Sequence, residues 1–125
     1  MDRQATQQLV LDFYDLFVNQ RDFDSAIRYL GEPYVQHRAD IPNDMEGLRA
    51  FNVGMRQKYP RLRAHVRRVF VDGDFVILHA HVVPEPGQRG SAHVDIFRVE
   101  DGKIVEHWDV DEPIPDQAAH SNPVV

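Results

Sequence analysis

The side chains best suited to acid/base chemistry are concentrated between His93 and Asp111, in the stretch HVDIFRVEDGKIVEHWDVD. Carboxylates and imidazoles are the groups that most often accept and release protons near neutral pH. Asp95, His107 and Asp109 are spaced so that they can share one face of a two-stranded hairpin. If the fold brings them together, this stretch is suited to moving protons.

The face on which these groups lie depends on the turn between the two strands. Gly102 favours a turn there, because glycine accepts the positive φ that a tight bend needs. If Glu100 pairs with Lys103, then Asp95 and Asp109 fall on opposite faces of the hairpin. If three residues loop out, with Gly102 as a bulge, the two carboxylates share a face.

We expect the bulged register, because it separates polar from apolar side chains. In that register Asp95 lies opposite His107, and His93 lies opposite Asp109. The face with the acids and imidazoles carries His93, Asp95, Phe97, Val105, His107 and Asp109. The other face carries Val94, Ile96, Ile104, Trp108 and Val110. An apolar face with little polar cover favours contact with a partner, so we expect a homodimer formed through the outer sheet face.

The hairpin is predicted to end a four-stranded antiparallel meander. The strands are expected at Leu62–Val71, Phe75–Val83, Gly90–Val99 and Lys103–Asp111. A turn at Asp72-Gly73, again with a bulge, places the apolar residues of the first two strands on one face: Leu62, Ala64, Val66, Val76, Leu78, Ala80 and Val82. The opposite face then groups Arg63, His65, Arg67, His79 and His81.

Helices are predicted before the strands. Apolar residues at helical spacing indicate a first helix from Gln4 to Asn19 and a short second helix from about Asp24 to Leu30. A short extended segment is expected at Tyr34–His37. Asn43 and Glu46 form a capping box that is typical of the start of a third helix.

This order predicts an α+β fold: three N-terminal helices packed in a strongly curved four-strand antiparallel sheet, plus a short extra strand. A sheet curved in this way forms a cone with a pocket inside. The 125 residues are enough for one domain with one core. We therefore expect a single domain over residues 1–125, with an extended tail at residues 113–125.

Composition argues against several functions. The formal net charge of −6 is unfavourable for nucleic-acid binding, and the absence of cysteine excludes disulfides and thiolate chemistry. No apolar run is long enough to cross a bilayer, and the N-terminus lacks a signal-peptide pattern, so we expect a cytoplasmic protein that does not bind membranes. No P-loop, dinucleotide fingerprint or G-x-S-x-G motif is present, so we expect no organic cofactor.

The histidines suggest a metal site as a further reading. His79, His81 and Glu85, with His93 later, resemble the first cupin motif. The glycine spacing and the second motif that complete a cupin are missing, and the helical first half does not fit one. We therefore expect neither a metal nor any other cofactor.

The order of elements, with YVQH at residues 34–37 and DIFRVEDGKIVEHWDV at residues 95–110, resembles the NTF2-like superfamily. Within it, the chain is similar to the SnoaL-like branch, which includes polyketide cyclases. The resemblance covers nearly the whole chain and implies the cone-shaped NTF2-like fold. It also implies that Asp109 is the acid/base aspartate, whereas the cyclases often have a histidine at the position of Asp95.

Ketosteroid isomerase, a more distant member of the superfamily, is similar at other positions. The resemblance implies that Tyr14 corresponds to its oxyanion-hole tyrosine. It further implies that Asp95, followed by Phe97, corresponds to its neutral oxyanion-hole aspartic acid. The general-base aspartate of that enzyme corresponds to His37, which is a departure. Many proteins with this fold only bind ligands, so the fold alone does not decide the function.

Two sets of candidate site residues follow. The candidate catalytic residues are Asp109, Asp95, His107, His37 and Tyr14. The candidate substrate-binding residues are Phe13, Phe17, Phe51, His79, His93 and Phe97. Structural roles are the alternative for these residues. Asp109 is then an exposed acid at the end of a strand, Asp95 forms a buried hydrogen bond with a histidine, and Tyr14 is a core tyrosine. The basic residues Arg61, Arg63, Arg67 and Arg68 form either a solvated face or a clamp for an acidic group.

The leading hypothesis is a cofactor-independent enzyme that removes a proton next to the carbonyl of a small apolar molecule and stabilises the enolate. Aldol-type cyclisation or isomerisation would follow. The alternatives are a non-catalytic small-ligand-binding protein and an assembly module that uses only the outer sheet face. A cavity with Asp95 and Asp109 in reach of one ligand atom favours chemistry. Carboxylates locked in ion pairs favour binding.

Overall fold

The computed structural model describes residues 1–125, which form three helices and a five-stranded sheet. The helices are α1 (Arg3–Tyr14), continued by a π-helical segment (Asp15–Gln20), α2 (Phe23–Ala26), continued by a 3₁₀ turn (Ile27–Tyr29), and α3 (Met45–Lys58). The strands are β1 (Leu30–Gln36), β2 (Arg63–Asp72), β3 (Phe75–Val83), β4 (Ser91–Glu100) and β5 (Lys103–Pro113). The predicted α+β class is confirmed.

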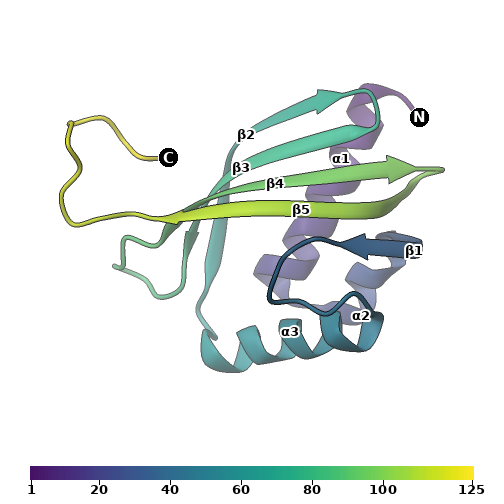
Figure 1. Cartoon of the computed structure of the whole chain (residues 1–125), viewed down its shortest axis with the longest axis horizontal. Coiled ribbons are helices and arrows are strands. Elements are labelled where there is room, and N and C mark those ends of the chain that lie inside the picture. The colour runs from purple at the N-terminus through teal and green to yellow at the C-terminus, as the bar shows by residue number, and fades with distance from the viewer.

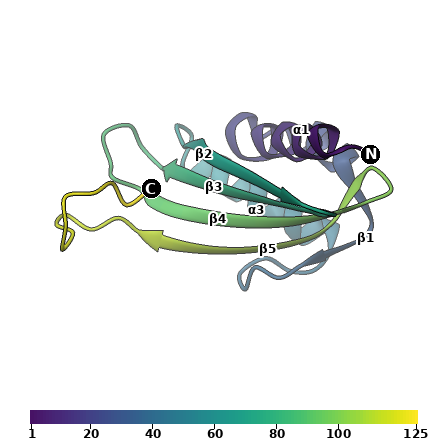
Figure 2. The ribbon, with the colours of Figure 1, turned by 90° about the horizontal axis from the view of Figure 1, so that it is seen from above.

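The sheet has the strand order β1-β5-β4-β3-β2 (Figure 1). Strands β2 to β5 form the predicted antiparallel meander, and β1 is the short extra strand, paired parallel to β5. Figure 2 shows that the strands curve and that α1 lies on one side of the sheet only. In Figure 1, α3 runs along the edge of the molecule, next to β1 and one end of β2. The helices thus cover one face of the sheet (Figure 1, Figure 2).

The core lies on the face of the sheet that the helices cover. Along β3 every second residue is buried, as expected for a strand with one covered face. The buried residues of the sheet are Leu30, Ala64, Val76, Leu78, Ala80, Val82, Asp95, Phe97, Val99, Ile104 and His107. From the helices, Val10, Phe13 and Leu48 pack against them. The apolar residues predicted for one face of β2 and β3 do share that face. The bulge predicted at the turn is wrong, because Asp72 pairs with Phe75 across a two-residue turn and the bulge lies at Arg67.

The pairing of β4 with β5 differs from the predicted register. Glu100 pairs with Lys103 across a two-residue turn, and the bulge lies further along, where Val105 is left without a partner. Asp101 and Gly102 have φ of 52° and 73°, the positive values that such a turn requires. Asp95 consequently lies opposite Asp109, not opposite His107.

This shift preserves the predicted faces in most of the hairpin. Moving the pairing by two residues leaves each side chain on the same side of the sheet, because side chains alternate with a period of two. His93 now lies opposite Asp111. Ile104, which was predicted on the outer face, is instead fully buried in the core, since it precedes the bulge and pairs with Val99.

Two helix boundaries also differ from the prediction. Leu30 begins β1 rather than ending the second helix. The cap of α3 is Asp44, whose carboxylate accepts a hydrogen bond from the main-chain N–H of Gly47 at 2.6 Å. The amide oxygen of Asn43 instead accepts from the main-chain N–H of Gln36 at 2.8 Å, and so ties the end of β1 to this loop.

The remaining chain, residues 114–125, contains no helix or strand and extends from the end of β5 (Figure 1). None of the helices combines the length and the apolar character needed to cross a membrane.

Candidate functional site

A cavity of about 150 Å³ lies between the helices and the inner face of the sheet. Its wall is mainly apolar and includes Phe13, Phe17, Ile41, Leu48, Phe51, Met55, Leu62, Val82 and Phe97. Val18 and the rings of Tyr14 and Tyr34 complete the 12 hydrophobic residues among the 20 that line it. The other eight are Arg21, Gln36, Arg38, Asn52, His93, Asp95, His107 and Asp109. A mainly apolar cavity with a few converging polar groups is the usual form of a small-molecule site.

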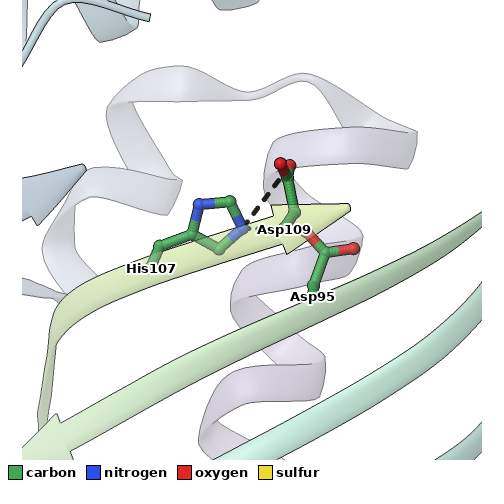
Figure 3. A group of neighbouring side chains, drawn as sticks. All are labelled: Asp95, His107 and Asp109. Atoms are coloured by element: carbon green, nitrogen blue, oxygen red, sulfur yellow. Dashed lines mark hydrogen bonds and ion pairs between the residues drawn. The ribbon is translucent and has the colours of Figure 1, made fainter. Parts of the chain in front are cut away.

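Asp95, His107 and Asp109 converge on one part of this cavity (Figure 3). Asp95 comes from β4, and the other two come from β5, where they are two residues apart and therefore share a face. Nε2 of His107 lies 2.8 Å from Oδ1 of Asp95 and 3.9 Å from Oδ2 of Asp109. The imidazole thus stands between two carboxylates that the sequence had predicted to lie near it.

Two further polar groups reach this cluster from β1 and the residues after it. Nδ1 of His107 lies 2.8 Å from the amide oxygen of Gln36. Arg38 donates from one guanidinium nitrogen to both carboxylate oxygens of Asp109, each at 3.1 Å. The parallel pairing of β1 with β5 places Gln36 beside His107 and brings this segment to the cavity.

Burial sets the protonation of the groups around the cluster. Desolvation, together with the nearby charge of Asp95, raises the pKa of Asp109 above its usual range; His107 and Arg38 partly oppose this shift. Burial also raises the pKa of Tyr14 and that of Tyr34, and both carboxylates add to the two shifts. The two phenols therefore keep their protons and are available as hydrogen-bond donors.

Most predicted site residues lie in the cavity wall, and two do not. Tyr14, Asp95, His107, Asp109, Phe13, Phe17, Phe51, His93 and Phe97 line the cavity. His37 lies outside it: its ring stacks on Trp108 with centroids 4.6 Å apart, and its Nε2 is 2.7 Å from a carboxylate oxygen of Glu106. Because Gln36 faces the cavity, the next residue along the extended chain faces the other way.

His79 also lies away from the cavity, on the outer face of the sheet, where its Nδ1 contacts the guanidinium of Arg68. None of the four clustered arginines lines the cavity. Arg61 instead forms an ion pair with Glu85 at 3.3 Å.

Pattern reading missed Tyr34, Gln36, Arg38 and Asn52 as cavity residues. The first three lie in or beside the extended segment that contains YVQH. Because side chains alternate along a strand, Tyr34 and Gln36 lie on the face opposite to His37. Only the partner strand decides which of these two faces points inward. Asn52 was passed over in the apolar stripe of α3; its amide nitrogen donates to the carbonyl of Phe17 at 2.9 Å, which ties α3 to the first helix.

The same cluster offers ligands that a metal ion could use. One ligand atom from each of Asp95, His107 and Asp109 lies within 4.8 Å of the others. Two carboxylates and an imidazole suit zinc or iron. Arg38 already contacts both oxygens of Asp109, however, and so supplies part of the positive charge that a cation would bring.

The SnoaL-like domain family matches residues 10–107 of this chain. No curated protein matches it significantly. Among solved structures, TsrD from Streptomyces laurentii is 23% identical and superposes with a TM-score of 0.73, covering 90% of this chain and 91% of that chain. AclR, a proposed hydroxylase from Streptomyces galilaeus, is 22% identical with a TM-score of 0.73, covering 89% and 91%.

A proposed polyketide cyclase from Acidithiobacillus ferrooxidans is 14% identical, with a TM-score of 0.73 over 90% of this chain and 92% of that chain. At these identities the structural neighbours show the fold alone. The family match covers most of the chain and ends within β5, so it includes Asp95 and His107 but stops before Asp109. The chain therefore belongs to the SnoaL-like family and has the NTF2-like fold.

Proposed function

We propose that this protein is a cofactor-independent acid/base enzyme that removes a proton next to the carbonyl group of a small apolar molecule. Asp109 is the base, and Tyr14 and a protonated Asp95 donate hydrogen bonds to the enolate oxygen. His107 assists by exchanging a proton with the carboxylates. The reaction class is aldol-type cyclisation or double-bond isomerisation.

The observation that carries this proposal is the position of Asp109 on the wall of an apolar cavity, with its pKa raised by burial. A carboxylate with a raised pKa is a stronger base than one in water, and a nearly dry cavity strengthens each hydrogen bond to a developing oxyanion. A structural neighbour with the same fold, from Acidithiobacillus ferrooxidans, is described as a proposed polyketide cyclase.

The size of the cavity supports a compact substrate. A cavity of about 150 Å³ is comparable to one that holds a single benzene ring. A cyclic ketone of six carbons is therefore a suitable first probe, and a larger substrate would place only one ring inside.

Exchange of α-hydrogens for deuterium tests the proposal without knowledge of the product. Cyclohexanone is incubated in D₂O with the protein, and the loss of its α-proton signal is followed by NMR. We expect exchange faster than the buffer background with the wild-type protein, and a rate at least about a hundredfold lower with Asp109→Asn. Equal rates for the two proteins would remove Asp109 from the mechanism.

A non-catalytic binding protein is the second candidate, and one observation favours it. Both carboxylates take part in ion pairs, Asp95 with His107 and Asp109 with Arg38. Tight binding of cyclohexanone without any exchange above background would support this second function.

We also propose that the protein forms a homodimer through the outer face of the sheet. A row of apolar residues crosses that face from β2 to β5: Phe70, Ile77, Ile96 and Trp108. Near it, Val110 and Phe75 are 67% and 38% exposed, and Phe70 itself is 55% exposed. Burial of these side chains against a second copy would remove apolar surface from water.

A further inference from the structure

The side chain of Gln36 has a fixed orientation. The main-chain N–H of Arg38 donates to its amide oxygen at 3.0 Å, and a main-chain N–H can only donate. The amide nitrogen lies on the other side, 3.3 Å from the hydroxyl of Tyr34. The oxygen of Gln36 is therefore the atom that faces His107.

This orientation determines the tautomer of His107. The amide oxygen of Gln36 only accepts hydrogen bonds, so Nδ1 of His107, at 2.8 Å, must carry a proton and donate it. In a neutral ring, Nε2 is then the basic nitrogen. That nitrogen is the one that lies 2.8 Å from Asp95 and 3.9 Å from Asp109.

We propose that Gln36 is a positioning residue: by holding His107 as the Nδ1–H tautomer, it leaves Nε2 free to carry a proton between Asp109 and Asp95. This inference rests on the proposed function. The main-chain N–H of Arg38 fixes the glutamine, and the glutamine fixes the imidazole. Nε2 of that imidazole is hydrogen-bonded to Asp95 and lies 3.9 Å from Asp109, a gap that a side-chain movement must close before a proton can pass.

The proton balance of the reaction explains why this connection matters. Asp109 takes the α-hydrogen as a proton, the C–H electron pair becomes the enolate double bond, and Asp95 gives its proton to the enolate oxygen. Asp109 is then protonated and Asp95 is ionised. Transfer from Asp109 to Nε2, and from Nε2 to Asp95, restores the base and the donor. An Nε2–H tautomer could not accept that proton.

Charge balance favours the same arrangement. With one proton shared between Asp95 and His107, that pair is neutral overall, and Arg38 balances the charge of Asp109. A second uncompensated carboxylate in a buried site would be costly. Arg21 also lines this cavity, and its guanidinium donates to the carbonyls of Tyr59 and Pro60 at 2.6 and 2.8 Å. Tyr14, Tyr34 and His93, which line it as well, bring no permanent charge.

The test measures both the tautomer of His107 and the rate at which cyclohexanone exchanges its α-hydrogens. The protein is labelled with ¹⁵N-histidine, and NMR determines whether Nδ1 of His107 carries a proton at about pH 8, where a free imidazole is neutral. We expect Nδ1–H in the wild type, and Nε2–H in Gln36→Leu. Cyclohexanone exchange should fall roughly tenfold in that variant.

Two further variants separate positioning from a loss of structure. Gln36→Glu also keeps an accepting oxygen beside Nδ1, so Nδ1 should stay protonated. Its added charge favours an imidazolium whose Nε2 already carries a proton, so the exchange rate should fall. Gln57→Leu is the same change as Gln36→Leu on an exposed surface of α3, and it should leave both measurements unchanged.

The outcomes distinguish this inference from the proposed function. A wild-type His107 without a proton on Nδ1 would overturn the role of Gln36, as would full exchange activity in Gln36→Leu. Absence of exchange in the wild type would remove the proposed function, and with it the proton transfer from Asp109 through His107 to Asp95. The tautomer measurement needs no turnover, so it would still decide whether Gln36 orients the imidazole.

Discussion

Replacing Arg38 with glutamine tests the electrostatics of the cavity. Arg38→Gln removes the cation that lies 3.1 Å from both oxygens of Asp109. The side chains of Arg38 and Asp109 are 24% and 9% exposed, so the pair lies between a surface ion pair and a fully buried one. Surface pairs contribute at most about 1 kcal/mol, and breaking a buried pair costs roughly 3–5 kcal/mol. We therefore expect a loss of about 2 kcal/mol near pH 8, between these limits.

The loss should depend on pH, and its sign follows from the raised pKa of Asp109. A carboxyl group with a raised pKa in the folded chain favours folding at low pH, and this contribution is lost as the pH rises through the folded-state pKa. Arg38 limits that loss by stabilising the ionised form. Its removal should therefore cost little near pH 4, where a carboxyl group with a raised pKa is largely protonated, and more near pH 8.

Urea unfolding at both pH values measures this effect in a cycle of four proteins: wild type, Arg38→Gln, Asp109→Asn and the double variant. A loss of about 2 kcal/mol corresponds to a drop in Tm of about 8 °C for a chain of this length. Arg38 also contacts Asp40, and the cycle subtracts that contact because it is present in both backgrounds. An equal loss at both pH values, or an equal loss in the Asp109→Asn background, would refute the reasoning.

Three other predictions concern the core, the base and the outer face. Phe97→Ala should destabilise the fold by about 3–5 kcal/mol in urea unfolding, because a buried ring is lost; a loss below about 1 kcal/mol would contradict the packing described. The exchange rate of cyclohexanone should rise with pH through the raised pKa of Asp109, because the base must be ionised, and Asp109→Asn should show no such rise. Val110→Arg should shift the mass measured by light scattering from dimer to monomer, and a wild-type monomer would exclude the dimer.

Local patterns predicted the parts of the fold that depend on neighbouring residues. Alternation along β3 and β4 places apolar residues on one face, and Asp101-Gly102 makes the turn of the last hairpin. Even with the bulge in the wrong place, Asp95 and Asp109 were assigned to the correct face, because the actual pairing differs from the predicted one by two residues. Ile104 was predicted on the wrong face because it lies before the bulge. There the actual pairing differs from the predicted one by one residue, which reverses the face of each side chain.

The polar environment of the cluster could not be read from the sequence. His37 was a candidate and Gln36 was not, although they are adjacent, since an isolated extended segment gives no sign of which side faces the interior. The parallel pairing of β1 with β5 joins segments about 70 residues apart, and it decides that Gln36 and Arg38 reach the cavity. The loop after β1 then brings Arg38 onto Asp109.

The sequence by itself therefore determined the α+β class and the inward face of the acids and imidazoles in the last hairpin, because both depend on short-range periodicity and turn chemistry. Only the tertiary structure decided which partners those groups have. Hydrogen bonds from Gln36 and Arg38, and burial beneath the helices, depend on contacts between distant segments, and these contacts set the charge and the orientation of Asp109 and His107.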